Sequence, residues 1–190
     1  MISDKELYKL LDACKKGSRN GQNELYKEFY AYSMSICLRY SKTRQEAIEI
    51  LNDGFLKIFT KIEKYTKGRP FKGWLRRVMI NAAIDCFRRN EKHYHGVDIS
   101  YAKNQTIDET AISKFAEEDI LKAIQALPPS YRMVFNLHAI EGYKHEEIAQ
   151  KLNITVGTSK SNLAVARSKL KRTLAIMGGE KEENHGRQKV

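Results

Sequence analysis

Residues 71–89 read FKGWLRRVMINAAIDCFRR, and this stretch decides how the rest of the chain is interpreted. Its apolar residues recur at the spacing of an amphipathic helix; they are Phe71, Trp74, Leu75, Val78, Met79, Ala82 and Cys86. A second strip holds Arg77, Asn81 and Arg88, with Trp74 at its border. Guanidinium groups bind phosphate, an amide can bind a base edge and an indole can stack on a base, so the strip suits a nucleic-acid strand. An ordinary core helix with a solvated basic face has the same pattern.

The composition indicates a basic, globular chain. It has 190 residues, of which 30% are charged and 42% hydrophobic, and this is enough for one large or two small domains. The formal net charge is +11, and most of the excess lies in the first 92 residues. Such a distribution is expected if the N-terminal half contacts a polyanion over the larger area. Many RNA-binding proteins are equally basic, so the charge alone does not select the partner.

Several function classes lack support in the sequence. Cys14, Cys37 and Cys86 have neither disulfide-framework nor metal-ligand spacing, and we expect buried thiols in a reducing cytosol. His93 and His95 have no accompanying ligand cluster that would make a zinc site. No nucleophile–base pair or phosphate-binding loop is visible, so we expect no enzyme activity, no cofactor and no small-molecule substrate. Without a signal peptide or membrane-length apolar run, the protein is expected to be cytoplasmic and not an integral membrane protein.

Local signals predict a four-helix unit in the first half of the chain. Ser3 with Glu6, and Thr43 with Glu46, have the spacing of capping boxes, which begin helices. A break at residues 64–70, which contain Gly68 and Pro70, separates the third helix from the fourth. The predicted helices cover residues 4–16, 22–40, 44–62 and 71–89.

The second half predicts a helix-turn-helix. Residues 117–126 form a helix that Pro128 ends, after a stretch with no helical period. Residues 145–152 then predict a short helix, which a Gly-containing turn joins to a longer basic helix at residues 158–174. Opposite its apolar stripe lie groups that can reach phosphates, base edges and thymine methyls; these are Lys160, Ser161, Ala164, Val165, Ser168, Lys171 and Arg172.

The sequence therefore predicts an all-α fold of two small helical domains on a flexible linker, the second of which contains the helix-turn-helix. The expected boundaries are residues 1–92 for the first domain, 93–116 for the linker, 117–176 for the second domain and 177–190 for a polar, frayed tail.

Two motifs also carry a family resemblance. The pattern Phe71-x-x-Trp74-Leu75 followed by Asn81-x-x-x-Asp85-x-x-Arg88-Arg89 resembles the promoter-melting and minus-ten recognition segment of bacterial sigma factors, above all those of the extracytoplasmic-function (ECF) type. Residues 141–170 resemble their minus-thirty-five-binding region. Residues 46–59, EAIEILNDGFLKIF, resemble the segment that holds RNA polymerase, although one acidic position of that segment is lost. The resemblances occur in the family's order and together cover nearly the whole chain.

The resemblance implies three sets of contact residues. The contact with core RNA polymerase falls on Glu49, Asn52 and Asp53. Minus-ten recognition and melting, including a pocket for a flipped base, fall on Tyr65, Thr66, Trp74, Arg77, Asn81 and Arg88. Minus-thirty-five recognition falls on Thr158, Lys160, Ser161, Ala164, Val165 and Arg167. Tyr65 has a second interpretation, in which it packs on Phe71 inside a surface loop. In the recognition helix, Ser159 and Asn162 depart from the family's pattern. Before the first helix of the helix-turn-helix, Lys144 replaces the Ser or Thr that usually supplies a capping acceptor.

The function implied by the resemblance is that of a sigma factor. Such a protein binds core RNA polymerase, directs it to specific promoter DNA, promotes melting for transcription initiation and is commonly held by an anti-sigma factor. Two rival interpretations remain at this point. A self-sufficient helix-turn-helix repressor or activator usually binds as a dimer, and the chain has no evident dimerisation element. A nucleic-acid enzyme would require an acidic metal-binding cluster, and none is visible in the sequence.

Overall fold

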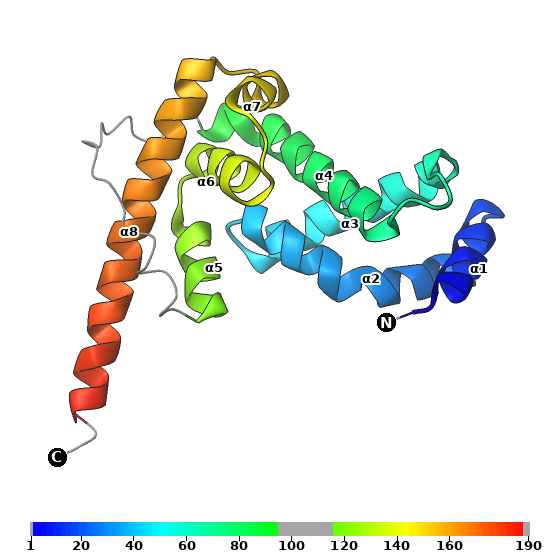
Figure 1. The fold of residues 1–190 in the computed structure, drawn as a ribbon, viewed down its shortest axis with the longest axis horizontal. Coiled ribbons are helices and arrows are strands. Elements are labelled where there is room, and N and C mark those ends of the chain that lie inside the picture. Colours follow the sequence, from blue (N-terminus) through cyan, green and yellow to red (C-terminus); the bar gives the residue numbers. More distant parts are fainter. Residues whose placement is uncertain (1, 95–115, 188–190) are drawn as a thin grey trace. The chain divides into compact units, whose positions relative to one another are not determined.

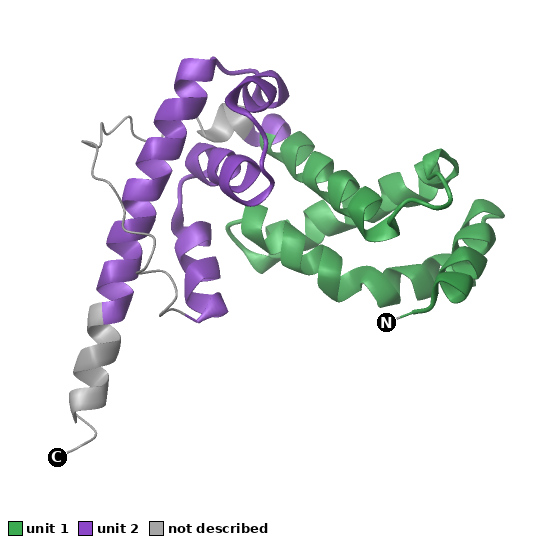
Figure 2. Cartoon of the chain, in the orientation of Figure 1, with its two compact units in different colours: residues 1–87 green, residues 88–190 purple. Residues whose placement is uncertain are grey.

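The computed structural model describes residues 2–94 and 116–187, with side chains described for residues 2–90 and 116–178. Within these ranges all regular structure is helical and no strand occurs (Figure 1). The chain separates into two compact units, residues 1–87 and 88–190 (Figure 2). The predicted all-α fold with two helical domains is confirmed. Most of the predicted linker, residues 95–115, lies outside the described residues.

The first unit is built from helices with local caps. Ser3 and Glu6 complete a capping box, as predicted, and Gly17, with φ +74°, follows the end of the first helix. Ser18 and Thr43 cap the next two helices by accepting hydrogen bonds from backbone N–H groups three residues later. The elements are α1 (Asp4–Lys15), α2 (Arg19–Tyr40), α3 (Arg44–Lys61), the 3-10 turn η1 (Ile62–Lys64) and α4 (Phe71–Tyr94), of which residues 88–94 are counted with the second unit.

Close packing of α2 against α1 and α3 forms the core of this unit. A Cβ atom on Gly21 would come within 2.7 Å of the Cβ of Ala13, so only glycine permits this approach of α1 and α2. Each fully buried aliphatic side chain contributes roughly 1.5–3 kcal/mol. Those with almost no exposure include Leu11, Leu25, Ile36, Ile50, Leu51, Ile58, Leu75 and Met79.

All three cysteines are buried thiols, as the sequence predicts. Burial raises the pKa of Cys14 to about 11 and, with a smaller opposing effect of Arg39, that of Cys37 to about 12. Both groups therefore remain protonated at neutral pH, and a protonated thiol is neither a good nucleophile nor a good metal ligand. Their role is to pack in the core.

In the second unit, helices collect around α8. Its core cluster joins α5, the residue after it, and the buried face of α8; the cluster consists of Ala123, Ile124, Leu127, Ala166, Leu170 and Leu174. The elements are α5 (Glu117–Ala126), α6 (Pro129–Phe135), the π-helical turn η3 (Asn136–Ile140), α7 (His145–Leu152) and α8 (Val156–Arg187).

Several helix boundaries differ from the prediction, including the end of α4, which is Tyr94 and not residue 89. The helix α2 begins at Arg19, three residues early, because the Ser18 hydroxyl accepts from the N–H of Gly21 and caps it there. The helix α8 begins at Val156 and continues to Arg187, well beyond the predicted end at residue 174. No proline interrupts residues 175–187, and Glu and Lys in this stretch favour a helix. The expected tail is thus helical over most of its length.

Candidate nucleic-acid interface

The helix α4 presents the predicted polar strip to solvent. Arg77, Asn81 and Arg88 are all exposed, and their spacing places them along one side of the helix. The α4 helix touches α2, where the rings of Phe29 and Phe71 lie 4.9 Å apart, and it also packs against α3. Because it is covered on two sides, it buries more residues than a single stripe predicts. The sequence reasoning missed Ile80, Ala83, Ile84 and Phe87.

The loop before α4 corrects the role expected for Tyr65. Its side chain is only 5% exposed, its hydroxyl donates a hydrogen bond to the carbonyl of Arg69, and its ring meets that of Phe71 edge-on at 5.3 Å. Burial raises the pKa of Tyr65, so the hydroxyl stays protonated. Tyr65 is thus a packing residue that shapes the loop from inside, as in the alternative interpretation. It does not present its ring as a free wall for a flipped base.

Two other residues from the predicted minus-ten set remain accessible near this loop. Thr66 is exposed, and Trp74 is half-buried. The Trp74 indole packs on the rings of Tyr65, at 5.7 Å, and Phe71, at 5.8 Å, which fixes its orientation while part of the ring faces solvent. An aromatic ring held in this way can stack on an unpaired base.

An ion pair joins α4 to α3. The Lys57 ammonium lies 2.6 Å from the carboxylate of Asp85, the acidic residue of the family-like motif in α4. Both side chains are partly exposed, so the pair contributes on the order of 0–1 kcal/mol.

The predicted polymerase contact lies on one side of α3. Glu49 and Asn52 are exposed and Asp53 is half-buried. One turn further along lies Leu56, whose side chain is 63% exposed. The sequence reasoning missed Leu56, although its position three and four residues after the polar pair was a usable signal. Leu56 thus adds one exposed apolar side chain to the surface on which the predicted polymerase contact lies.

The helix-turn-helix has the predicted geometry. Asn153, in the left-handed region with φ 54°, ends α7, and the Thr155 hydroxyl caps α8 by accepting from the N–H of Thr158 at 3.0 Å. At the start of α7 the N–H of Lys144 donates to the carboxylate of Glu147 at 2.8 Å, while the lysine side chain supplies no cap, as expected. The two helices are therefore held by local hydrogen bonds at both sides of the turn.

The exposed side of α8 includes most of the predicted reading residues, with one correction. Val165 is only 8% exposed and belongs to the core, because α8 is covered by both α6 and α7. Its methyl groups are therefore unavailable to thymine. The predicted residues that are exposed are Thr158, Lys160, Ser161, Ala164 and Arg167.

A pair of histidines lies next to the start of α8, and the sequence analysis did not predict it. The rings of His138, in η3, and His145, in α7, stack at 4.4 Å with an interplanar angle of 14°. The Nδ1 of His145 lies 2.9 Å from the hydroxyl of Ser159, which is fully buried in α8, and the Nδ1 of His138 lies 2.9 Å from the carbonyl oxygen of Tyr143. The pKa of His145 is lowered, most of all by desolvation and then by His138 and Lys160. Ser159, which departs from the family's pattern, thus has a hydrogen-bond partner in His145. A single sequence could not identify this contact.

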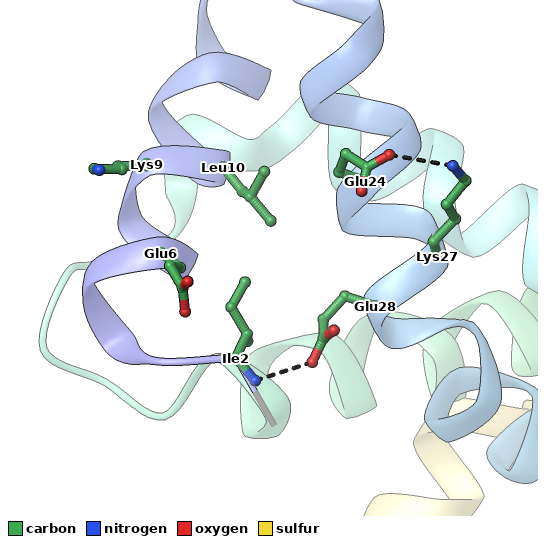
Figure 3. A pocket seen from close by; sticks show the side chains of 7 residues that line it. All are labelled: Ile2, Glu6, Lys9, Leu10, Glu24, Lys27 and Glu28. Atoms are coloured by element: carbon green, nitrogen blue, oxygen red, sulfur yellow. Dashed lines mark hydrogen bonds and ion pairs between the residues drawn. The ribbon is translucent and has the colours of Figure 1, made fainter.

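A depression between α1 and α2 shows no comparable chemistry. Figure 3 shows the residues around it, with Lys9 extending away from the hollow. Glu24 pairs with Lys27 at 3.2 Å, and Glu28 accepts from the N–H of Ile2 at 3.2 Å, so these charges are satisfied locally. Among the described residues, no three His, Cys, Asp or Glu side chains are grouped to hold a metal ion. No helix in the described part of the chain is apolar over a length that would cross a bilayer.

Two family models match this chain. The model for sigma-70 region 2 matches residues 25–93, and the model for sigma-70 region 4 matches residues 117–170. The chain belongs to the sigma-70 family. The first match contains the polar surfaces of α3 and α4, and the second contains the helix-turn-helix, so all three surfaces described above fall inside family regions.

Curated relatives specify the ECF group of this family. The chain is 26% identical over 163 residues to the ECF RNA polymerase sigma factor SigE of Mycolicibacterium smegmatis, covering 83% of this chain but 63% of that relative. It is 25% identical over 178 residues to the ECF RNA polymerase sigma factor SigW of Bacillus subtilis, covering 87% and 95% of the two chains. This sigma-70 family member is therefore of the ECF type. Sigma factors are transcription regulators and not enzymes.

A solved structure also matches the chain. The sigma factor RpoE of Bartonella quintana, determined in complex with the anti-sigma factor NepR, aligns with a TM-score of 0.48 and 19% identity, over 81% of this chain and 96% of that one.

Proposed function

We propose that this ECF sigma factor binds core RNA polymerase, directs it to specific promoters and captures unpaired minus-ten bases during DNA melting. Its site of action is then the cytoplasm, with promoter DNA and core polymerase as partners. As in other members of the family, an anti-sigma factor is expected to hold it when it is inactive. The proposal involves no catalysis and no small-molecule substrate.

One observation carries the proposal furthest: the exposed strip of Arg77, Asn81 and Arg88 on α4. The opposite sides of this helix are buried, so the strip's position is fixed by the core. Two guanidinium groups flank one amide, and the half-buried Trp74 lies at the border. Cations that bind phosphate, with an amide and an indole for bases, are the groups that a single strand requires. The strip is therefore suited to DNA that has already separated.

The other two surfaces complete the assignment. The α3 patch of Glu49, Asn52, Asp53 and Leu56 is acidic and apolar, and hence unsuited to DNA; we assign it to the polymerase. The exposed side of α8 suits duplex DNA, because a helix presented by a helix-turn-helix enters the major groove. Lys160 and Arg167 supply phosphate or guanine contacts there, and Ser161 and Ala164 face base edges.

The match to region 2 argues against a self-sufficient helix-turn-helix repressor, which would need no α4 strip. Gel-shift on a duplex promoter, with and without core polymerase, separates the two functions. A sigma factor binds weakly when free and specifically once core is added, because neither small unit alone offers the area of a typical specific DNA-binding protein. Specific binding of equal strength without core would overturn the proposal in favour of a self-sufficient regulator.

A further inference from the structure

The loop between η1 and α4 is a tight turn with a fixed inner side. The N–H of Arg69 donates to the carbonyl of Thr66 at 3.3 Å, and Gly68, at the third position of the turn, has φ +89°. A glycine with positive φ at that position is the signature of a type II turn. Inside the turn, the buried Tyr65 donates its hydroxyl hydrogen bond to the carbonyl of Arg69. The exposed Thr66 thus occupies the first position of an ordered turn.

The helix α1 holds the other side of the same turn. The N–H of Gly68 donates to the hydroxyl of Tyr8 at 3.2 Å. The ammonium of Lys67 lies 3.3 Å from the carboxylate of Asp12 and 5.7 Å from the centre of the Tyr8 ring. Tyr8 and Asp12 are one helical turn apart, so two neighbouring loop residues are bound by two neighbouring positions of α1.

These contacts are separate from the packing of α1 itself. The helix docks on its unit through Leu7, Leu11 and Cys14, which are buried, whereas Tyr8 and Asp12 are only partly buried. The helix therefore has a core-facing side and a loop-facing side. A residue on the loop-facing side can therefore be substituted with little loss of packing on the core-facing side.

We propose that α1 is a positioning element for the base-capturing loop, in which Tyr8 and Asp12 hold the turn so that Thr66 meets the flipped base. The inference rests on the proposed function, and it assigns a role to residues outside the expected minus-ten set. Its physical basis is preorganisation: a turn fixed before the base arrives loses less conformational freedom on capture. Each contact is modest, since both side chains of the Lys67–Asp12 pair are about half exposed, and the two act together.

The test uses the full-length protein with core polymerase on a duplex promoter. Tyr8→Phe keeps the ring over Lys67 but removes the hydroxyl acceptor, and Asp12→Asn removes the charge. Loss of one such hydrogen bond should lower the fraction of open complex, measured by permanganate reactivity of unpaired thymines, by about two- to tenfold. Closed-complex binding and the melting temperature should stay near wild type. Tyr30→Phe, in α2 of the same unit, is the matched control and should leave opening unchanged.

A double-mutant cycle separates positioning from general weakening. If Tyr8 acts through Thr66, Tyr8→Phe should have little further effect in a Thr66→Ala background, and discrimination among the four bases at the captured position should narrow in either single variant. If the effects of the two single substitutions on opening multiply in the double variant, and discrimination among the bases is unchanged, the inference is overturned even if opening is impaired.

The same experiment keeps the two proposals distinguishable. If Thr66→Ala and Asn81→Ala impair opening while Tyr8→Phe and Asp12→Asn do not, the positioning role is wrong and the proposed capture of bases stands. If none of the four variants impairs opening, the capture function itself is wrong. A fall in opening for all four, with the non-additive cycle, supports both.

Discussion

Gly54 of α3 lies so close to Met79 of α4 that a Cβ atom on residue 54 would come within 2.3 Å of the methionine sulfur. Both residues are buried, and this contact sets the approach of the helix that carries the proposed polymerase patch to the helix that carries the proposed DNA strip. A glycine inside a helix costs about 1 kcal/mol relative to alanine. The close contact is the structural reason that glycine is present here.

We predict that Gly54→Ala destabilises the first unit by about 1 kcal/mol. Overpacking of a filled core costs about 1–3 kcal/mol, which exceeds the gain in helix propensity. In a Met79→Ala background the space is vacated, so the same substitution should become stabilising. Urea unfolding followed by the fluorescence of Trp74, the single tryptophan, reports on this unit alone. A destabilising effect of equal size in both backgrounds would contradict the explanation.

Adjacent residues of α8 should respond in opposite ways. Val165→Ala should destabilise the second unit by about 2 kcal/mol, because Val165 is buried. Ala164→Ser, on the exposed side, should leave stability unchanged and alter the preferred minus-thirty-five sequence. Thermal unfolding and selection from a promoter library measure the two effects. If the library gives an altered consensus for Val165→Ala but not for Ala164→Ser, the assignment of the two sides is reversed.

The α3 patch should bind polymerase through both its charge and its exposed leucine. Asp53→Lys and Leu56→Ser should each lower affinity for core polymerase while leaving the melting temperature near wild type, because each substitution removes one group from the proposed interface and none from the core. Ile176→Ser is the matched control, because Ile176 is 55% exposed but lies on α8. Unchanged pull-down of core by both α3 variants would show that the interface lies elsewhere.

The histidine pair predicts a loss of stability in acid. The pKa of His145 in the folded protein is lowered from 6.5 by desolvation, His138, Lys160 and Arg167, against an opposing effect of Glu146. The unfolded chain therefore takes up this proton first, and stability falls as pH decreases below about 6.5. Melting of α7 and α8, followed by NMR amide signals, should show the decrease. His145→Gln retains a hydrogen-bonding group near Ser159 and cannot be protonated, so its stability should depend less steeply on pH over the same range.

The parts of the fold that sequence predicted best are those set by local interactions. The capping box of Ser3 and Glu6 involves residues three apart, and the cap of Thr43 on α3 is equally local. The exposure of Arg77 and Asn81 also followed from helical periodicity, because a helix that buries one side must present the other.

The parts that sequence did not predict depend on the second layer of packing. Val165 lies where one stripe on α8 would leave it exposed, but α6 and α7 pack on this helix in addition to α5. Tyr65 is of a residue type that is common in binding sites. Its structural role is visible only in the turn, which brings the Arg69 carbonyl to its hydroxyl. The partner of Ser159 is fourteen residues away, beyond the reach of any local pattern.

The central claim is that the α4 strip captures bases only after the strands separate. Asn81→Ala tests it most directly, because Asn81 is exposed and its loss should not disturb the core. With core polymerase on a duplex promoter, we predict near-normal gel-shift but permanganate reactivity lowered about tenfold, which corresponds to the lower part of the roughly 1–3 kcal/mol of a bidentate hydrogen-bonded contact between a side chain and a base. Asn23→Ala, exposed on α2, should behave as wild type. Full permanganate reactivity of Asn81→Ala on the duplex promoter would contradict the account.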